Sequence, residues 1–165
     1  MNKIYLSIGS NVGDRKHYLE ESIRLININV GRVTQKSSVY ETAGWGITDQ
    51  PMFLNQVIEL ETTRLPQEIL RIIQKIEFSL GKRKELKWGP RNIDIDILYY
   101  GNEIVNEEDL TVPHPHIQDR RFILEPMNEI ASDWEDPAHN MTIKEMTINC
   151  ADQSYVHPLN QVSVE

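Results

Sequence analysis

The sequence has only one cysteine, Cys150, among its 165 residues. A single cysteine cannot form an internal disulfide bond, so a reducing compartment is the simplest expectation. Long apolar runs are also missing. A signal peptide needs about 7–15 consecutive apolar residues and a spanning helix about 20, whereas the apolar residues Ile4, Leu6 and Ile8 alternate with others and the pattern stops at Asn11. We therefore expect a cytoplasmic protein with no membrane partner.

Positive charge is scarce as well. The 17 Lys and Arg residues against 25 Asp and Glu residues give a net charge of −8. Nucleic acids and anionic membranes attract broad positive surfaces, so the composition argues against a nucleic-acid partner. The length fits one domain. Because the apolar pattern fades after Met146, we expect a domain over residues 1–146 and a C-terminal tail over 147–165.

Apolar periodicity predicts the element order β-α-β-β-α-β-α. Strands are predicted over 4–8, 32–40, 53–62 and 93–100; helices are predicted from about Asp14 to Gly31, over 65–80 and within 120–131, where Pro126 fits a helix interior poorly. The order is that of the split βαβ, ferredoxin-like folds. We therefore expect an α+β sandwich in which one antiparallel sheet carries helices mainly on one face, with the first strand half-buried. This architecture alone does not define a function.

The segment from Lys87 to Leu98 carries the clearest chemical signal. On a strand, Asp94 and Asp96 share one face, and the isoleucines that flank them point to the other. Two carboxylates at this spacing can hold magnesium ions that also bind phosphate oxygens. An isolated Asp-x-Asp pattern is more often the solvated face of an edge strand.

The neighbouring residues favour the metal interpretation. Between positions 82 and 91 there are five basic residues and one acid, Glu85; the basic residues are Lys82, Arg83, Lys84, Lys87 and Arg91. Such a run is commonly just a solvated loop. In a chain with a net charge of −8, however, cations gathered beside paired carboxylates are what a metal-bound polyphosphate requires.

At this point the sequence resembles a known family. The string from Lys87 to Leu98 is similar to the signature of the 6-hydroxymethyl-7,8-dihydropterin pyrophosphokinases. Other blocks agree with that family in order and spacing: residues 7–11 with 13–15, 40–42, 49–51 with 53–55, 110–115, and Arg120 with Phe122. The resemblance extends over about residues 3–146 and is far more specific than a short motif.

The resemblance implies transfer of the terminal diphosphate of ATP to the pterin hydroxymethyl group, with release of AMP and with two Mg²⁺ ions. The implied catalytic residues are Lys82, Arg91, Asp94 and Asp96, of which Asp94 and Asp96 would also ligate the metal. Residues implied to bind the nucleotide are Glu77, Arg83, Lys84, Trp88, Thr111, His114 and Arg120; those implied to bind the pterin are Thr42, Ala43, Trp45, Phe53, Asn55 and Phe122. ATP and the dihydropterin are the expected partners of a monomer.

The residues that the resemblance implies for the pterin also suit its chemistry. A flat polar heterocycle calls for aromatic faces, which Phe53 and Phe122 offer, and for amides such as Asn55 at its edge. Ordinary core packing is the alternative for the two phenylalanines. Lys82 stands where the family has arginine, and lysine lacks the bidentate fork. Two other functions remain open: a phosphotransferase that releases ADP, and a non-catalytic binding module.

Overall fold

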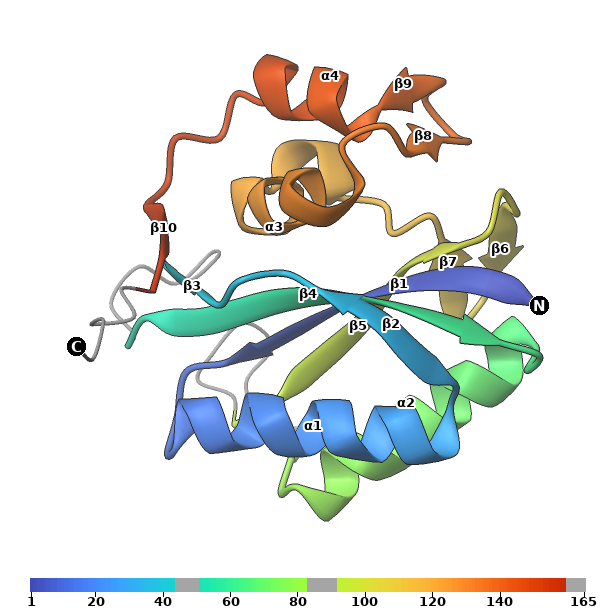
Figure 1. The fold of residues 1–165 in the computed structure, drawn as a ribbon, viewed down its shortest axis with the longest axis vertical. Helices are drawn as coiled ribbons and strands as arrows, with labels where there is room; N and C mark the ends of the chain where they lie inside the picture. The colour runs from blue at the N-terminus through green and yellow to red at the C-terminus, as the bar shows by residue number, and fades with distance from the viewer. Residues whose placement is uncertain (44–50, 83–91, 160–165) are drawn as a thin grey trace.

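The computed structural model describes residues 1–43, 51–82 and 92–159 (Figure 1). Its elements are β1 (Asn2–Ser10), α1 (Arg15–Asn29), β2 (Arg32–Lys36), β3 (Tyr40–Thr42), β4 (Phe53–Thr62), α2 (Pro66–Ser79), β5 (Asp94–Tyr100), β6 (Val105–Glu107), β7 (Leu110–Val112), the short 3₁₀ helix η1 (Ile117–Asp119), α3 (Arg121–Ala131), β8 (Glu135–Asp136), β9 (Met141–Thr142), α4 (Ile143–Asn149) and β10 (Val156–Pro158). The predicted α+β class is confirmed.

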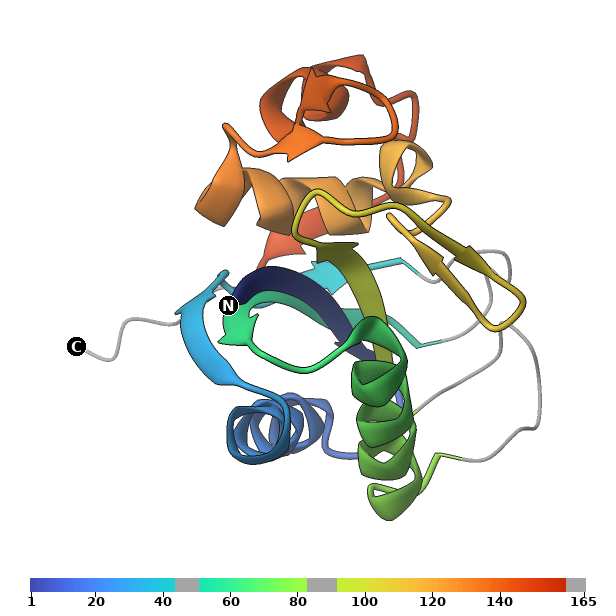
Figure 2. The ribbon, with the colours of Figure 1, turned by 90° about the vertical axis from the view of Figure 1, so that its right-hand side faces the viewer.

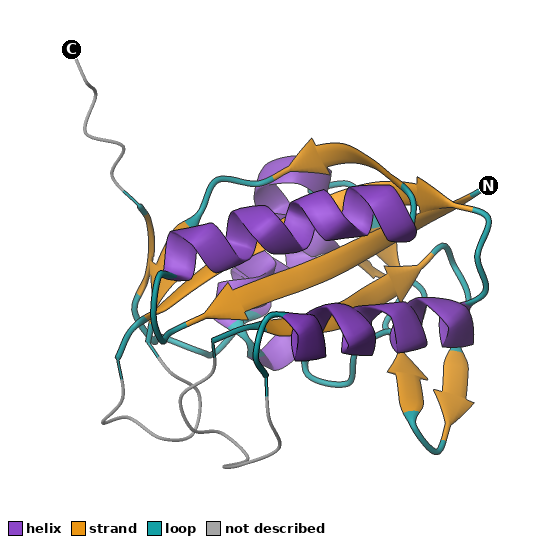
Figure 3. Ribbon diagram, turned by 90° about the horizontal axis from the view of Figure 1, so that it is seen from below, coloured by secondary structure: helices purple, strands orange, loops and turns teal. Residues whose placement is uncertain are grey.

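The main sheet is antiparallel, in the order β10-β3-β4-β1-β5, with β2 also paired to β4. β1 and β2 flank β4, and β4 and β5 flank β1, so two β-α-β units interleave. This is the predicted split βαβ arrangement. Because such crossovers are right-handed, both crossover helices lie on one face of the sheet, as Figure 3 shows for α1 and α2.

The face under α1 and α2 holds the larger core. Ile69, Ile73 and Ile76 recur at helical spacing on α2 and are almost completely buried. They pack in one cluster with Ile4 and Leu6 of β1 and with side chains of α1 and β5. The strong amphipathic pattern of residues 65–80 thus produces the predicted helix.

The opposite face is covered by α3 and α4, so the sheet lies between two helical layers (Figure 2). Tyr5 and Tyr99 pack there against Met127 of α3 and Met146 of α4. The prediction of helices mainly on one face was therefore wrong, and so was the half-buried first strand, since every residue from 4 to 10 is buried. Tyr5 is 2% exposed, and its hydroxyl donates to Glu59 at 2.6 Å, so its polar group has a partner within the buried layer.

Local capping explains where the helices begin. The Asp14 carboxylate accepts from the backbone N–H of His17 at 3.1 Å and starts α1. Pro66 occupies the first turn of α2, where its missing N–H has no cost, and Glu68 accepts from the Leu65 N–H at 2.8 Å. The predicted third helix is confirmed as α3, with Pro126 inside it.

Two further predictions need correction. The strand predicted over 32–40 is split into β2 and β3, because Ser37 exchanges two hydrogen bonds with Val57, one of them through the Ser37 hydroxyl. The expected tail after Met146 is structured: α4 crosses that position and β10 pairs with β3. Both elements are short and bury few apolar residues, so their sequences carry little periodic signal.

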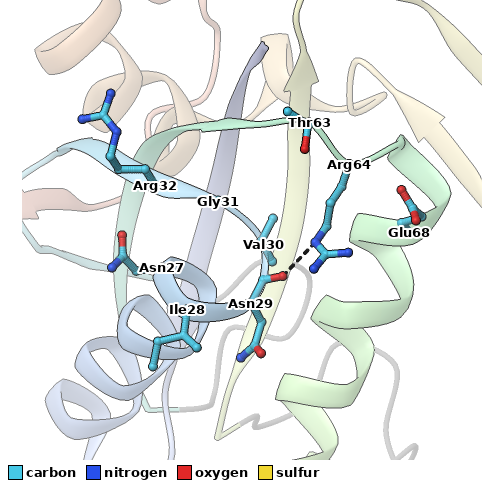
Figure 4. A pocket seen from close by; sticks show the side chains of 9 residues that line it. All are labelled: Asn27, Ile28, Asn29, Val30, Gly31, Arg32, Thr63, Arg64 and Glu68. Carbon is cyan, nitrogen blue, oxygen red and sulfur yellow. Dashed lines mark hydrogen bonds between the residues drawn. The ribbon is translucent and has the colours of Figure 1, made fainter.

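A polar hollow of about 540 Å³ lies where α1, β2, β4 and α2 meet (Figure 4). There the Arg64 Nε donates to the Asn29 carbonyl at 2.9 Å, at the end of α1. Asn2 of β1 pairs with Thr62 at this end of the sheet, and Gly9 lies at the other end. Over the residues that the structure describes, no helix is long and apolar enough to cross a membrane.

Candidate active site

The two predicted metal-binding aspartates lie on β5, beside the central strand β1. Asp94 is opposite Gly9 and Asp96 is opposite Ser7 in the β1–β5 ladder. Ile95 and Ile97 belong to the core under α1 and α2. The carboxylates therefore share the α3 side of the sheet, as strand alternation predicted.

Lys82 joins two of the nearby carboxylates. Its Nζ lies 3.0 Å from Glu77 Oε2 and 2.7 Å from Asp94 Oδ1. The same Glu77 oxygen accepts from the backbone N–H of Ile95 at 2.7 Å, and Glu77 is only 7% exposed. Glu77 thus ties the end of α2 to β5, and Lys82 completes a charged bridge to the aspartate pair.

The turn after α2 places Lys82 in this bridge. Gly81 has a φ of +102°, a conformation that favours glycine. The Lys82 N–H then donates back to the Glu77 carbonyl at 2.9 Å, which closes a Schellman-type turn. Asn92 secures the turn by donating to the Leu80 carbonyl at 2.6 Å.

Burial and neighbouring charges together set the electrostatics of the cluster. Burial raises the pKa of Asp96 to about 8, and Asp94 and Glu77 add to this rise while Lys82 and Arg120 oppose it. Burial also raises the pKa of Glu77, against the effect of Lys82. Burial lowers the pKa of Lys82, but Asp94 and Glu77 outweigh it and the net shift is upward. A bound cation would relieve the repulsion among these carboxylates.

The oxygen donors of this cluster fit magnesium, which prefers carboxylates, phosphates and water. Among residues 1–43, 51–82 and 92–159, no group of three or more His, Cys, Asp or Glu side chains is arranged to hold a metal ion. The aspartate pair would therefore need phosphate oxygens or water to complete a coordination shell, which is the usual arrangement for magnesium at nucleotide sites.

His114 and Arg120 lie on the chain segment that leads into α3. The His114 N–H donates to the Leu98 carbonyl at 3.1 Å, and its ring Nδ1 accepts from the His116 N–H at 3.2 Å. Burial lowers the pKa of His114 to about 4, and Arg120 and His116 add to the shift. The neutral ring thus carries its proton on Nε2.

Arg120 links the aspartates to an aromatic side chain. Burial lowers the pKa of Arg120, against the attraction of Asp96 and Asp94. Its guanidinium carbon lies 5.7 Å from the centre of the Phe122 ring. A cation–π contact of this kind keeps the guanidinium beside a flat apolar surface.

Three predicted pterin residues come together next to this cluster. Asn55 and Thr42 are 5% and 1% exposed, and the Asn55 amide donates to the Thr42 hydroxyl. Phe53 is opposite Thr42 in the β3–β4 ladder, and Asn55 is opposite Gly9 in the β1–β4 ladder. Gly9 is therefore flanked by Asn55 on one side and by Asp94 on the other.

The other predicted residues are more dispersed or not described. Thr111 is exposed on the β6–β7 hairpin, and the Ala43 N–H donates to the Tyr155 carbonyl at 3.1 Å. Phe122 is half-buried in the first turn of α3. Five predicted residues lie outside the described residues: Trp45, Arg83, Lys84, Trp88 and Arg91.

Three residues with a role in the geometry were not predicted. Gly9 leaves the space that the Asn55 side chain fills, since a Cβ atom there would overlap Asn55 Oδ1. Asn11 donates to the Pro51 carbonyl at 3.1 Å and Arg15 to the Met52 carbonyl at 2.9 Å, which anchors the entry to β4. Glycine within a strand pattern is a recognised sign of such close approach, so Gly9 could have been found.

Comparisons with known proteins define the class first: this chain is an enzyme of the pyrophosphokinase type, an ATP-dependent diphosphotransferase. It belongs to the 7,8-dihydro-6-hydroxymethylpterin-pyrophosphokinase (HPPK) family, whose model matches residues 5–132. The family resemblance seen in the sequence is thereby confirmed.

Curated relatives agree over most of their length. A 2-amino-4-hydroxy-6-hydroxymethyldihydropteridine pyrophosphokinase of Bacillus subtilis is 43% identical over 140 residues, which cover 84% of each chain. The enzyme of that name from Aquifex aeolicus is 41% identical over 145 residues, or 88% of this chain and 90% of the relative.

Solved structures support the fold. A crystal structure of an HPPK-DHPS protein in complex with substrates superposes with a TM-score of 0.73 at 16% identity, over 89% of this chain. Plasmodium falciparum HPPK-DHPS gives 0.72 at 17% identity, over 90% of this chain. This chain spans 43% of each of those two chains.

Proposed function

We propose that this protein transfers the terminal diphosphate of ATP to the hydroxymethyl oxygen of 6-hydroxymethyl-7,8-dihydropterin, releases AMP and acts in folate biosynthesis. Family membership and the names of the two bacterial relatives support this substrate pair. The assignment depends on the site as well, because a fold of this class hosts many activities.

The observation that carries the proposal is the position of Gly9. On one side of it lies the anionic cluster around Asp94, and on the other lies the buried Asn55–Thr42 pair with Phe53. A metal-bound diphosphate on the first group and a pterin on the second would meet over a residue without a side chain. Such positioning of two reactants is a large part of what an enzyme of this kind has to achieve.

In this proposal Asp94 and Asp96 would hold two Mg²⁺ ions, which would supply positive charge to the phosphates. Lys82, which is bridged to Glu77 and Asp94, adds positive charge beside the aspartate pair. The Arg120 guanidinium is attracted by Asp96 and Asp94 and lies over Phe122, so in this proposal it contacts both the phosphates and the edge of the pterin site. Arg83, Lys84 and Arg91 remain sequence predictions for phosphate binding, Trp88 for the nucleotide and Trp45 for the pterin.

The proposed reaction is an in-line attack. The pterin hydroxyl oxygen forms a bond to the β-phosphorus, the bond from that phosphorus to the oxygen shared with the α-phosphate breaks, and AMP leaves with that oxygen. The hydroxyl proton passes to solvent. The protein has to align the reactants and balance charge rather than form a covalent intermediate.

On the pterin side, Asn55 can read the heterocycle edge with both a donor and an acceptor. Its amide already donates to Thr42, so its Oδ1 is held in a defined direction over Gly9. Phe53 and Phe122 provide the aromatic surfaces from β4 and α3. Their stacking on the flat ring supplies affinity without dictating the chemistry.

The test is a nucleotide product assay with purified protein, ATP, magnesium and the dihydropterin. AMP should form only when pterin and metal are both present. At the magnesium concentration that gives the wild type its half-maximal rate, Asp94→Asn and Asp96→Asn should strongly reduce AMP formation, whereas Asp133→Asn, an exposed acid after α3, should not. Formation of ADP instead of AMP would replace the proposal with ordinary phosphorylation, and absence of turnover with folded protein would favour a binding module.

A further inference from the structure

A short stretch of chain near the C-terminus bonds to both sides of the proposed pterin site. We refer to residues 152–158 as the C-terminal clasp. Figure 1 shows the chain passing from α4 beside α3 to β10, which lies against β3 at the edge of the sheet. The clasp lies outside residues 5–132, the part matched by the family model.

On the α3 side, Asp152 receives two backbone hydrogen bonds. Its Oδ2 accepts from the Arg121 N–H at 2.9 Å, and its Oδ1 accepts from the Ser154 N–H at 2.9 Å. Arg121 is the first residue of α3, so Asp152 satisfies one of the helix's otherwise unbonded N–H groups and places negative charge at its N-terminus. Burial raises the pKa of Asp152, but these two bonds outweigh it and the net shift is downward.

The Arg121 side chain makes a second connection on the same side. Its Nη1 donates to the Ser154 carbonyl at 3.0 Å. Together with the Asp152 bonds, this fixes the first turn of α3 to the clasp. The next residue in that turn is Phe122, which the proposed function assigns to the pterin, and the preceding residue is Arg120.

On the sheet side, β10 of the clasp pairs with β3. The Tyr155 carbonyl accepts from the Ala43 N–H at 3.1 Å, and Val156, 4% exposed, pairs with Thr42. Thr42 in turn receives the Asn55 amide. The backbone of the two predicted pterin residues Thr42 and Ala43 is therefore held by the clasp from outside the site.

We infer that the C-terminal clasp sets the distance between the two walls of the pterin pocket, Thr42–Ala43 on β3 and Phe122 on α3, and so determines affinity for the pterin. This inference rests on the proposed function. Asp152 and Arg121 act as positioning residues and touch no substrate. The anionic cluster is built from α2 and β5, through Glu77, Lys82 and Asp94. Arg120 adjoins the clasp, but its N–H donates to the Ile117 carbonyl at 3.2 Å and not to the clasp, so ATP affinity should depend on the clasp less than pterin affinity does.

The test compares Asp152→Ala and Asp152→Asn with the matched control Asp133→Ala, an exposed acid beyond the other end of α3. Binding of 6-hydroxymethyl-7,8-dihydropterin and binding of magnesium–ATP are measured separately by calorimetry, with kcat and KM for each substrate. We expect Asp152→Ala to weaken pterin binding about tenfold, equivalent to about 1.4 kcal/mol, and to raise the pterin KM more than it lowers kcat. Asp152→Asn, which keeps one acceptor oxygen, should fall between Asp152→Ala and the wild type.

Amide hydrogen exchange gives a second readout that does not depend on activity. The Ala43 and Arg121 N–H groups should exchange slowly in the wild type, and the Arg121 group should exchange faster in Asp152→Ala. If pterin binding is unchanged although Arg121 exchange accelerates, the clasp does not control the pocket and the inference is wrong.

Parallel loss of pterin and ATP binding with a lowered melting temperature would also overturn the inference, because it indicates a structural role only. Failure of the proposed function looks different: the wild-type protein itself would release no AMP and bind no dihydropterin. The exchange pattern of Ala43 and Arg121 would then still report whether the clasp is formed, and the pterin role would be rejected with the function.

Discussion

Gly9 lies directly opposite Asn55 in the β1–β4 ladder, and a side chain at position 9 would overlap the Asn55 carboxamide oxygen. On its other side Gly9 is opposite Asp94 of β5. The smallest residue of the central strand thus separates the carboxylates from the amide. In the proposed function, a strand position with no side chain would allow the two substrates to approach each other above the sheet.

Gly9→Ala should therefore move the Asn55 side chain and weaken dihydropterin binding, by about tenfold or about 1.4 kcal/mol. Calorimetric titration with the dihydropterin measures the effect. In an Asn55→Ala background the added methyl group has no amide to displace, so Gly9→Ala should cost much less there. Equal losses in both backgrounds would show that the methyl group acts on something other than Asn55.

The bridge from Glu77 through Lys82 to Asp94 makes a prediction about stability. Lys82→Met removes the cation while Glu77 stays buried, which should lower the free energy of unfolding by about 1–3 kcal/mol without ATP or metal. Urea unfolding measures this change.

Glu77→Gln in the Lys82→Met background is the informative control, because it removes the buried Glu77 carboxylate that has lost its lysine partner. The double variant should be more stable than Lys82→Met alone, although both lack the bridge. If the second substitution lowers stability further, the charge on Glu77 is not what the lysine compensates.

Much of this architecture was predictable because its signals are local. Ile69, Ile73 and Ile76 show helical spacing that is sufficient to place α2, and strand alternation is sufficient to put Asp94 and Asp96 on one face. The ferredoxin-like order followed from the same patterns. Short elements gave no such signal: β10 is held to β3 largely by backbone hydrogen bonds, which leave no trace in side-chain periodicity.

The site was less predictable because it depends on contacts between distant segments. The position of Lys82 between Glu77 and Asp94 requires the left-handed Gly81 and the Asn92 bond to Leu80. The role of Gly9 depends on the register of two neighbouring strands. Strand register and contacts between distant residues cannot be inferred from a short local stretch of sequence.

Metal dependence gives the third prediction. If Asp94 and Asp96 hold magnesium with the ATP phosphates, excess chelator should abolish AMP formation and added magnesium should restore it. Asp96→Asn should require at least about tenfold more magnesium for half-maximal rate, since one ionised ligand is lost. Unchanged magnesium dependence in that variant, with activity retained, would place the metal elsewhere.

The fourth prediction concerns His114, whose pKa burial lowers to about 4 from an ordinary value of 6.5, with Arg120 and His116 adding to the shift. Between these values the unfolded chain binds more protons than the folded one, so stability falls as the pH falls. Its contribution is fully present above about pH 6.5 and should decline by about 2 kcal/mol on going to pH 5.

The measurement is urea unfolding of the wild type and of His114→Gln at pH 7.5 and pH 5. The variant is needed because Glu77 and Asp96 have raised pKa values, so their carboxyl groups change stability with pH in the opposite direction. This carboxyl effect is present in both proteins and cancels in the comparison. The wild type should lose more stability than the variant over this interval. NMR titration of the His114 ring supplies the direct check: a pKa near 6.5 would mean that the ring is solvated and that the neutral, Nε2-protonated form is not enforced by the fold.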